Sequence, residues 1–266
     1  MFDLDYKIPV INPDRYEGSY NGIPVDAADP RYSEPLIRLE EVGVAYQSHH
    51  ARTDGLNWPY HRPVEGSRPD MWLRKSAAEM LGRANDHLRP FGLELFILDA
   101  YRTMECQRGL WDFYYAEGKA KRPNASDTAW RNYALQHIAD PLCFSPNDST
   151  TWSAHPTGGA VDLTLRSVKT GEVVDMGARF EEITPISYND HFERQVAKGL
   201  IDSNDSRLWH RRMLHWAMSR EGFLNDPFVF WHFDWGNQLY VKIRSSLFAE
   251  SPKAAWYGYV ESPPSV

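Results

Sequence analysis

Cysteine is scarce in this sequence: only Cys106 and Cys143 occur among its 266 residues. Two thiols in a chain of this size are more typical of a reducing compartment than of a disulfide scaffold. No apolar run approaches the roughly 18 residues that a membrane-spanning helix needs. The acidic, proline-containing N-terminus also lacks the basic and apolar segments of a signal peptide. Together these absences predict a cytoplasmic protein that does not enter a membrane.

Positive charge is in short supply as well. The 29 Lys and Arg residues are outnumbered by 36 Asp and Glu residues, which gives a formal net charge of -7. The basic residues form no stripe, so nucleic acid is not expected as a partner. Hydrophobic residues make up 42% of the chain and aromatic residues 14%. This content argues against disorder and is enough for the core of one full domain.

The character of the sequence changes near residue 68. Residues 1–68 show little periodicity, apart from a short strand or helix at 36–42, and predict an N-terminal arm packed on a domain formed by residues 69–266. Apolar spacing predicts the later elements: helices at 70–88, 104–119, 128–138 and 206–220, and strands at 93–99, 160–165 and 228–233, the last continuing toward 240. This order indicates an α+β fold with a small, mainly antiparallel sheet packed with helices.

The segment SAHPTGGAVDLTL carries the most informative pattern. His155 precedes a Gly-Gly turn, and Asp162 lies in the strand that follows. Gly158 and Gly159 would let the backbone turn sharply and bring both side chains to one point. Imidazole and carboxylate are suitable ligands for Zn²⁺, and His232 in FVFWHFDW is a candidate third ligand. Two histidines and one aspartate leave a position open for water, as in a catalytic zinc site.

Each of these residues also has a simpler interpretation. His232, among aromatic residues, could be a core histidine with satisfied hydrogen bonds, and Asp162 could cap the end of a strand. The two glycines could form an ordinary turn. From the residues alone these alternatives stay open.

Four motifs follow one another along the chain. They are Asp99-Ala100-Tyr101-Arg102, Ser153-x-His155-x-x-Gly158-x-Ala160-x-Asp162, Met176-Gly177-x-Arg179-Phe180-Glu181 and Trp231-His232. In this order they resemble the signature of the D-alanyl-D-alanine dipeptidases, zinc metallopeptidases of the type found in vancomycin resistance. The resemblance covers roughly residues 70–240 and implies the α+β metallopeptidase fold of that family.

The resemblance implies a role for each matching residue. The zinc ligands would be His155, Asp162 and His232. The residues expected to bind substrate are Ser153, Tyr101 and Glu181, the last in place of a family aspartate that receives the free ammonium of the substrate. Arg102 would stabilise the oxyanion, since a fixed cation can lie close to the developing charge. Arg102 could also be an ordinary ion-pair arginine, and Glu181 a solvated acid.

The resemblance fails at one catalytic position. The family has a general-base glutamate three residues before its last histidine ligand, whereas this chain has Val229, which cannot move a proton. Asp234 is the leading replacement, because residues at i and i+2 of a strand share a face and Asp234 would lie beside His232. The alternative role for Asp234 is to orient a ligand. Asp226 and Glu221 are further candidates, in a loop that could fold back.

The predicted function is zinc-dependent hydrolysis of a small dipeptide or amide by metal-bound water, with Arg102 helping to polarise the carbonyl. The missing glutamate leaves two alternatives. One is a metal enzyme of another class, such as a lyase, a cyclase or an Fe²⁺ oxygenase, acting on an amino-acid-like substrate, since two histidines and a carboxylate also hold iron. The other is a binding protein without turnover.

Overall fold

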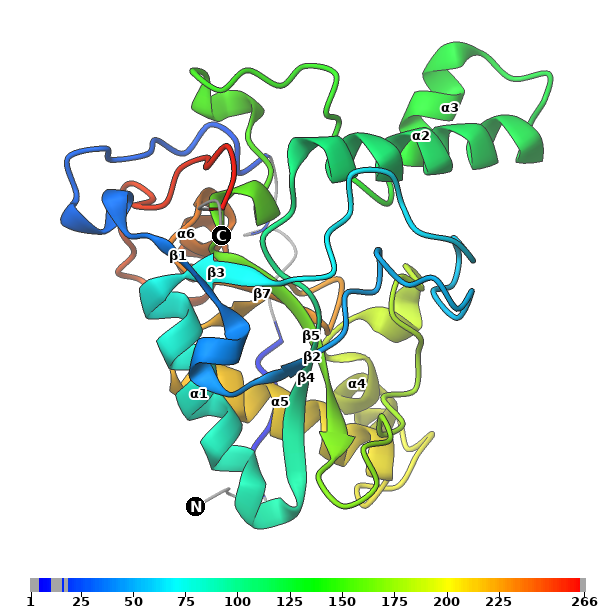
Figure 1. Ribbon diagram of the computed structural model, residues 1–266. Helices are drawn as coiled ribbons and strands as arrows, with labels where there is room; N and C mark the ends of the chain where they lie inside the picture. Colours follow the sequence, from blue (N-terminus) through cyan, green and yellow to red (C-terminus); the bar gives the residue numbers. More distant parts are fainter. Residues whose placement is uncertain (1–4, 11–15, 17–18, 264–266) are drawn as a thin grey trace.

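The computed structural model describes residues 5–10, 16 and 19–263. A mixed five-stranded sheet lies at its centre (Figure 1). The strands in spatial order are β2 (Ala45–Tyr46), β4 (Leu93–Asp99), β5 (Ala160–Ser167), β7 (His232–Asp234) and β6 (Leu224–Asn225). β2 runs parallel to β4, whereas the other neighbours are antiparallel. β1 (Leu36–Arg38) and β3 (Trp72–Arg74) form a separate antiparallel pair.

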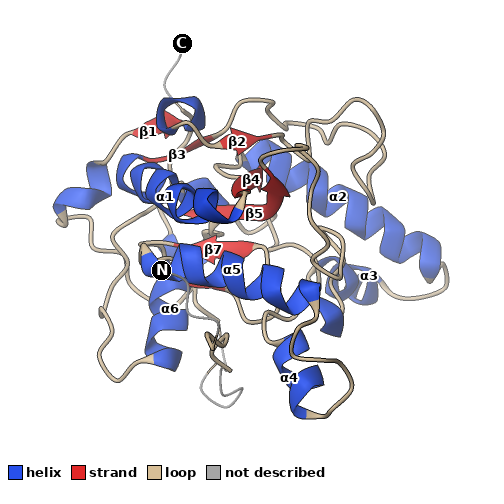
Figure 2. Ribbon diagram, turned by 90° about the horizontal axis from the view of Figure 1, so that it is seen from below, coloured by secondary structure: helices blue, strands red, loops and turns tan. Residues whose placement is uncertain are grey.

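Helices surround these strands, seen in two views in Figures 1 and 2. They are α1 (Lys75–Leu88), α2 (Met104–Lys121), α3 (Asp127–Ala134), α4 (His191–Ala197), α5 (Ser206–Arg220) and α6 (Gln238–Leu247). α2 and α3 lie side by side, away from α1 and α5 (Figure 1). The predicted α+β fold with a small, mainly antiparallel sheet is therefore confirmed.

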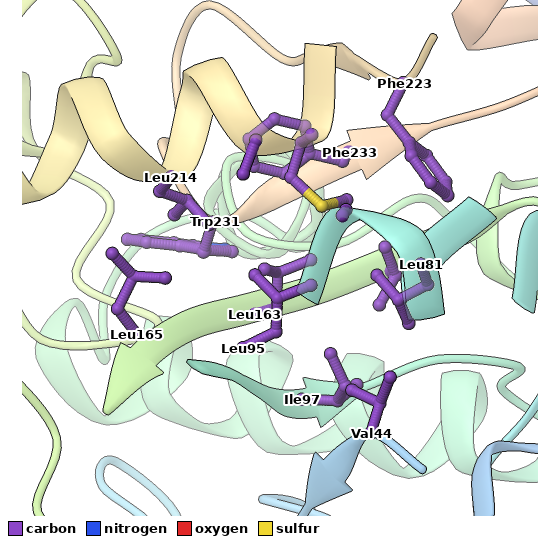
Figure 3. Packing of buried hydrophobic residues seen from close by; sticks show 14 of the residues in the cluster. Val44, Leu81, Leu95, Ile97, Leu163, Leu165, Leu214, Phe223, Trp231 and Phe233 are labelled. Atoms are coloured by element: carbon purple, nitrogen blue, oxygen red, sulfur yellow. The ribbon is translucent and has the colours of Figure 1, made fainter. Parts of the chain in front are cut away.

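Side-chain alternation along the central strands separates the core from the polar face of the sheet. Leu163 and Leu165 of β5 enter a hydrophobic cluster with residues of α1 and α5, as Figure 3 shows. Because neighbouring residues of a strand point to opposite faces, Asp162 faces away from this cluster. Phe233 of β7 is also in the cluster, which places His232 and Asp234 on the same face as Asp162.

α2 supplies a wall opposite that polar face. Thr103 caps the helix, since its hydroxyl accepts a hydrogen bond of 3.0 Å from the backbone N–H of Cys106. Gln107, Leu110 and Tyr114 are buried and recur at helical spacing, so they share one face. The cap thus fixes where α2 begins, directly after the turn that carries Arg102.

Predicted bounds of three elements were wrong. One of these elements, the helix predicted at 128–138, ends at Ala134. The helix predicted from residue 70 begins at Lys75, because Trp72–Arg74 pair with β1 instead. The last strand is limited to His232–Asp234, since an aspartate turn at Asp226, whose Oδ1 accepts a 2.8 Å bond from the N–H of Phe228, precedes it. The predicted extension toward residue 240 is instead the start of α6, which Asn237 caps.

The predicted N-terminal arm contributes to both sheets. β1 and β2 come from it, and β2 forms one edge of the central sheet. The division of the chain at residue 68 stays a prediction.

His215 of α5 is expected to make the protein less stable in mild acid. Its side chain is buried next to the core, and burial lowers its pKa to about 4. The unfolded chain takes up a proton below the ordinary histidine pKa of about 6.5, and the folded chain does so only near 4. The contribution of neutral His215 to stability is therefore fully present above pH 6.5. The free energy of unfolding falls by roughly 3 kcal/mol as the pH drops to 4. Chemical denaturation at several pH values would measure this loss.

The variant His215→Gln provides the control for this measurement. Glutamine does not titrate, so its stability should change less between pH 7 and pH 4 than that of the wild type. Parallel pH profiles for the two proteins would contradict the assignment.

Candidate active site

The register of the sheet brings three polar side chains into one row. Asp99, at the end of β4, is paired with Asp162 of β5, and Asp162 is paired with His232 of β7. His155 joins them from a short 3₁₀ turn (His155–Thr157) just before β5. Residues far apart in the sequence thus meet at one end of the central strands.

The Gly-Gly pair allows the turn that places His155. Gly158 has a φ of +72°, in the left-handed region that favours glycine. Gly159 is limited by space: a Cβ there would lie 2.3 Å from the carbonyl oxygen of Trp235. A side chain at either position would therefore displace the loop between His155 and β5.

His155, Asp162 and His232 form a group that could hold one metal ion. One potential ligand atom from each lies within 4.8 Å of the others, and all three residues are buried. His155 Nε2 is 3.3 Å from Asp162 Oδ2, and His232 Nδ1 is 2.8 Å from Asp162 Oδ1. The structure thus brings the three predicted metal ligands together.

The outer nitrogen of each imidazole also has a partner. His155 Nδ1 lies 2.8 Å from the carbonyl oxygen of Ala100, to which it can only donate. His232 Nε2 lies 3.1 Å from Asp234 Oδ2. The Ala100 contact fixes the tautomer of His155, so the lone pair of its Nε2 faces the centre. Asp234 lies beside the outer nitrogen of His232, where a carboxylate can orient a ligand histidine. Two nitrogen donors and a carboxylate suit Zn²⁺ or Fe²⁺, so the residues fit the expected ion.

Asp234 does not lie where a proton carrier is expected. Its side chain is fully buried, one oxygen faces the outer nitrogen of His232, and the other accepts a 2.7 Å bond from Asn237. The alternation of side chains along the strand correctly predicted that Asp234 lies beside His232. Asp234 contacts, however, the imidazole nitrogen that points away from Asp162. This placement disagrees with the predicted proton transfer and matches the alternative, orientation of His232.

Arg102 is held rigidly beside the ligand group. Its Nε donates to Asp99 over 2.8 Å, and one terminal nitrogen donates to Gln107 over 3.0 Å. The other terminal nitrogen lies 3.8 Å from Asp162 Oδ2. Burial would raise the pKa of Asp162, but the neighbouring imidazoles of His155 and His232 outweigh it and hold the pKa well below its usual range. A fixed cation and an ionised ligand therefore lie side by side.

A cavity of about 220 Å³ opens over these residues. Ser153, Arg102, Val229 and Glu181 line it together with the three ligand residues. Ser153 Oγ is buried there without a hydrogen-bond partner among the described residues, so it is available to a ligand. Tyr101 does not line the cavity, because its hydroxyl donates to carbonyls of the C-terminal segment. That placement disagrees with the predicted substrate contact.

Three acidic side chains line the cavity: Asp162, Glu181 and Asp226. Burial raises the pKa of Asp226 to about 6, and His232 opposes this shift. Glu221, another candidate from the sequence, is bound instead by Arg83 and His87 outside the cavity.

The cavity includes residues that the sequence did not single out. Tyr20, Tyr60, Tyr114 and His137 line it, and His50 contacts Glu181 from behind. Tyr114 lies on the inward face of a predicted helix, so the periodicity of α2 offered a signal for it. His137 lies at the end of the helix predicted at 128–138, just after α3, whereas Tyr20, Tyr60 and His50 come from irregular segments, which carry no periodic signal.

Two histidines and one carboxylate are a ligand set that suits a catalytic zinc site. The family model described as D-ala-D-ala dipeptidase matches residues 65–250, most of the chain. The chain belongs to this family and is a peptidase-like hydrolase. It is 28% identical to a D-alanyl-D-alanine dipeptidase of Synechocystis over 173 residues, 63% of this chain and 70% of that relative. For one of Enterococcus faecalis the values are 26% over 201 residues, 74% and 90%.

Among solved structures, the chain is loosely similar to VanYB in complex with D-alanine-D-alanine. The TM-score is 0.41 and the sequence identity 17%, over 72% of this chain and 86% of that chain. None of the helices in the described part of the chain has the length and apolar character to cross a membrane.

Proposed function

We propose that this chain is a zinc-dependent peptidase that cleaves the amide bond of a small dipeptide-like substrate. The observation that carries the proposal is the convergence of His155, Asp162 and His232 beside Arg102 in one cavity. The curated relatives are named D-alanyl-D-alanine dipeptidases, which supports a substrate of this size. The cytoplasmic location and the absence of nucleic-acid partners belong to the same proposal.

The proposed ligand residues and Arg102 would have different roles in catalysis. A zinc ion held there would polarise a carbonyl and lower the pKa of water. Arg102, fixed by Asp99 and Gln107, would stabilise negative charge that develops on the substrate oxygen. Ser153, with its unpartnered hydroxyl, would hydrogen-bond the substrate.

Asp226 is the residue that we propose for proton transfer. Of the three acids in the cavity lining, Asp162 belongs to the ligand group, and Glu181 is bound by His50 and Tyr114. Asp226 lines the same cavity as Val229, the residue at which the sequence resemblance implies a glutamate in the family. It would take a proton from water and deliver it to the leaving amine, a role that typically contributes about 100 to 10,000-fold.

Elemental analysis and a D-Ala-D-Ala hydrolysis assay on the same purified sample test this function. We expect about one zinc per chain together with release of D-alanine. Zinc without hydrolysis of any dipeptide or amide would leave a binding protein, the alternative that Val229 favours. Iron in place of zinc would direct the search to oxygen chemistry. Absence of any metal would overturn the proposal.

A further inference from the structure

Glu181 is already bound by the protein. Its Oε1 lies 3.0 Å from His50 Nε2, and its Oε2 accepts a 3.1 Å hydrogen bond from the Tyr114 hydroxyl. The side chains of His50 and Glu181 are only 1% and 11% exposed. Glu181 also has a φ of +69°, a conformation that non-glycine residues adopt only where their surroundings enforce it. The fold therefore holds the Glu181 carboxylate toward His50 and Tyr114.

His50 belongs to a group of four charges that balance one another. Its second nitrogen lies 3.6 Å from Asp99, and Asp99 pairs with Arg102 over 2.6 Å. Burial lowers the pKa of His50, but Asp99 and Glu181 outweigh it and raise the pKa to about 9. Apart from Asp162, which belongs to the proposed ligand group, two carboxylates thus face two cations before any substrate binds. An ammonium placed beside Glu181 would add an uncompensated positive charge to a buried site.

The cavity wall next to Glu181 is aromatic and apolar. Tyr114 stacks on His137, with ring centroids 4.2 Å apart and an interplanar angle of 6°. Tyr60 contacts the Tyr114 hydroxyl with its own hydroxyl over 3.2 Å, and Leu110 and Ile138 complete this side. Burying an acyl group against such surface is favourable, whereas an ammonium loses its hydration there, a cost that attraction to the ring faces offsets only in part.

We propose that His50 makes the site selective for substrates whose nitrogen beside Glu181 is acylated, in preference to dipeptides with a free α-ammonium. The substrate class is an N-acylated amino-acid amide or peptide. Its amide N–H can donate to Glu181 without adding charge. The inference rests on the proposed function, because it concerns the same site and the same hydrolysis.

The comparison of D-Ala-D-Ala with N-acetyl-D-Ala-D-Ala tests this selectivity, since the two share the scissile bond. On the zinc-loaded protein, kcat/KM should favour the acetylated substrate by about tenfold or more. His50→Gln keeps an N–H donor for Glu181 but removes the positive charge, so the ratio should shift at least about tenfold toward the free dipeptide. His49→Gln is the matched control, because His49 bonds the Trp58 carbonyl instead and should leave the ratio unchanged.

Calorimetric binding of D-alanine amide and N-acetyl-D-alanine amide separates this inference from the proposed function. If no dipeptide is cleaved but the acetylated amide binds more tightly, and His50→Gln reverses that order, only the proposed function fails. Tighter binding of the ammonium form by the wild type would overturn the inference. The same holds if His50→Gln leaves the order unchanged, or if neither amide binds.

Discussion

Replacing His155 by alanine is expected to remove the bound metal and bring hydrolysis to background. His155 Nε2 faces Asp162 over 3.3 Å and is one of three potential ligand atoms within 4.8 Å of one another. Three protein ligands are the usual minimum for a catalytic zinc site, so the loss of one leaves a pair that binds zinc weakly. His232→Ala should have the same effect. Metal content after dialysis, measured beside the hydrolysis rate, checks both variants.

Asp234→Asn should have an intermediate effect, weakening metal binding without abolishing it. Asp234 contacts the outer nitrogen of His232 and not the cavity, so the variant should still bind zinc. We expect metal affinity to fall by about 10 to 100-fold, as is typical when the carboxylate partner of a ligand histidine is lost. His210→Ala is the control, since His210 contacts the Asp175 carbonyl outside the cavity. One full equivalent of zinc in His155→Ala would sink the ligand assignment.

Local periodicity decided which parts of the fold could be predicted. The strand Leu93–Asp99 and the helix Ser206–Arg220 have the bounds that their apolar spacing indicates. The prediction of a strand at FVFW was wrong, because aromatic residues occur in both strands and buried turns. The structure of this run depends on Asp226 and Pro227, which bend the chain just before it.

The candidate site also consists of residues that local sequence patterns indicate and contacts that such patterns do not. His155, Asp162 and His232 could be proposed from the sequence because they belong to motifs with recognisable spacing. The contact of His50 with Glu181 spans 131 positions and begins in the irregular N-terminal segment, so no local pattern points to it. The face of the strand that carries Asp234 followed from period two, but the nitrogen of His232 that it meets depends on the rotation of the imidazole ring.

Asp226→Asn is expected to lower kcat by about 100 to 10,000-fold while the protein keeps its metal. Asparagine has nearly the same shape as aspartate, and its side-chain oxygen can still accept the 2.8 Å hydrogen bond from the N–H of Phe228. The backbone bond from residue 226 to the His232 carbonyl is unaffected as well. The turn before β7 should therefore survive, and the variant loses only a group that can carry a proton. Steady-state kinetics with metal analysis would measure both effects.

A second substitution decides whether the lost group was the proton carrier. Val229 lines the same cavity and lies three residues before His232, where the family resemblance implies a glutamate. In the double variant Asp226→Asn with Val229→Glu, the new carboxylate should restore much of the lost kcat. Val229→Leu in the same background is the control, because it fills space without moving protons. Unchanged kcat in Asp226→Asn would refute the role of Asp226. A carboxylate at position 229 can replace Asp226 as the base only if both side chains reach the same water molecule. A loss of kcat that Val229→Glu does not restore would therefore mean that Asp226 acts in binding instead.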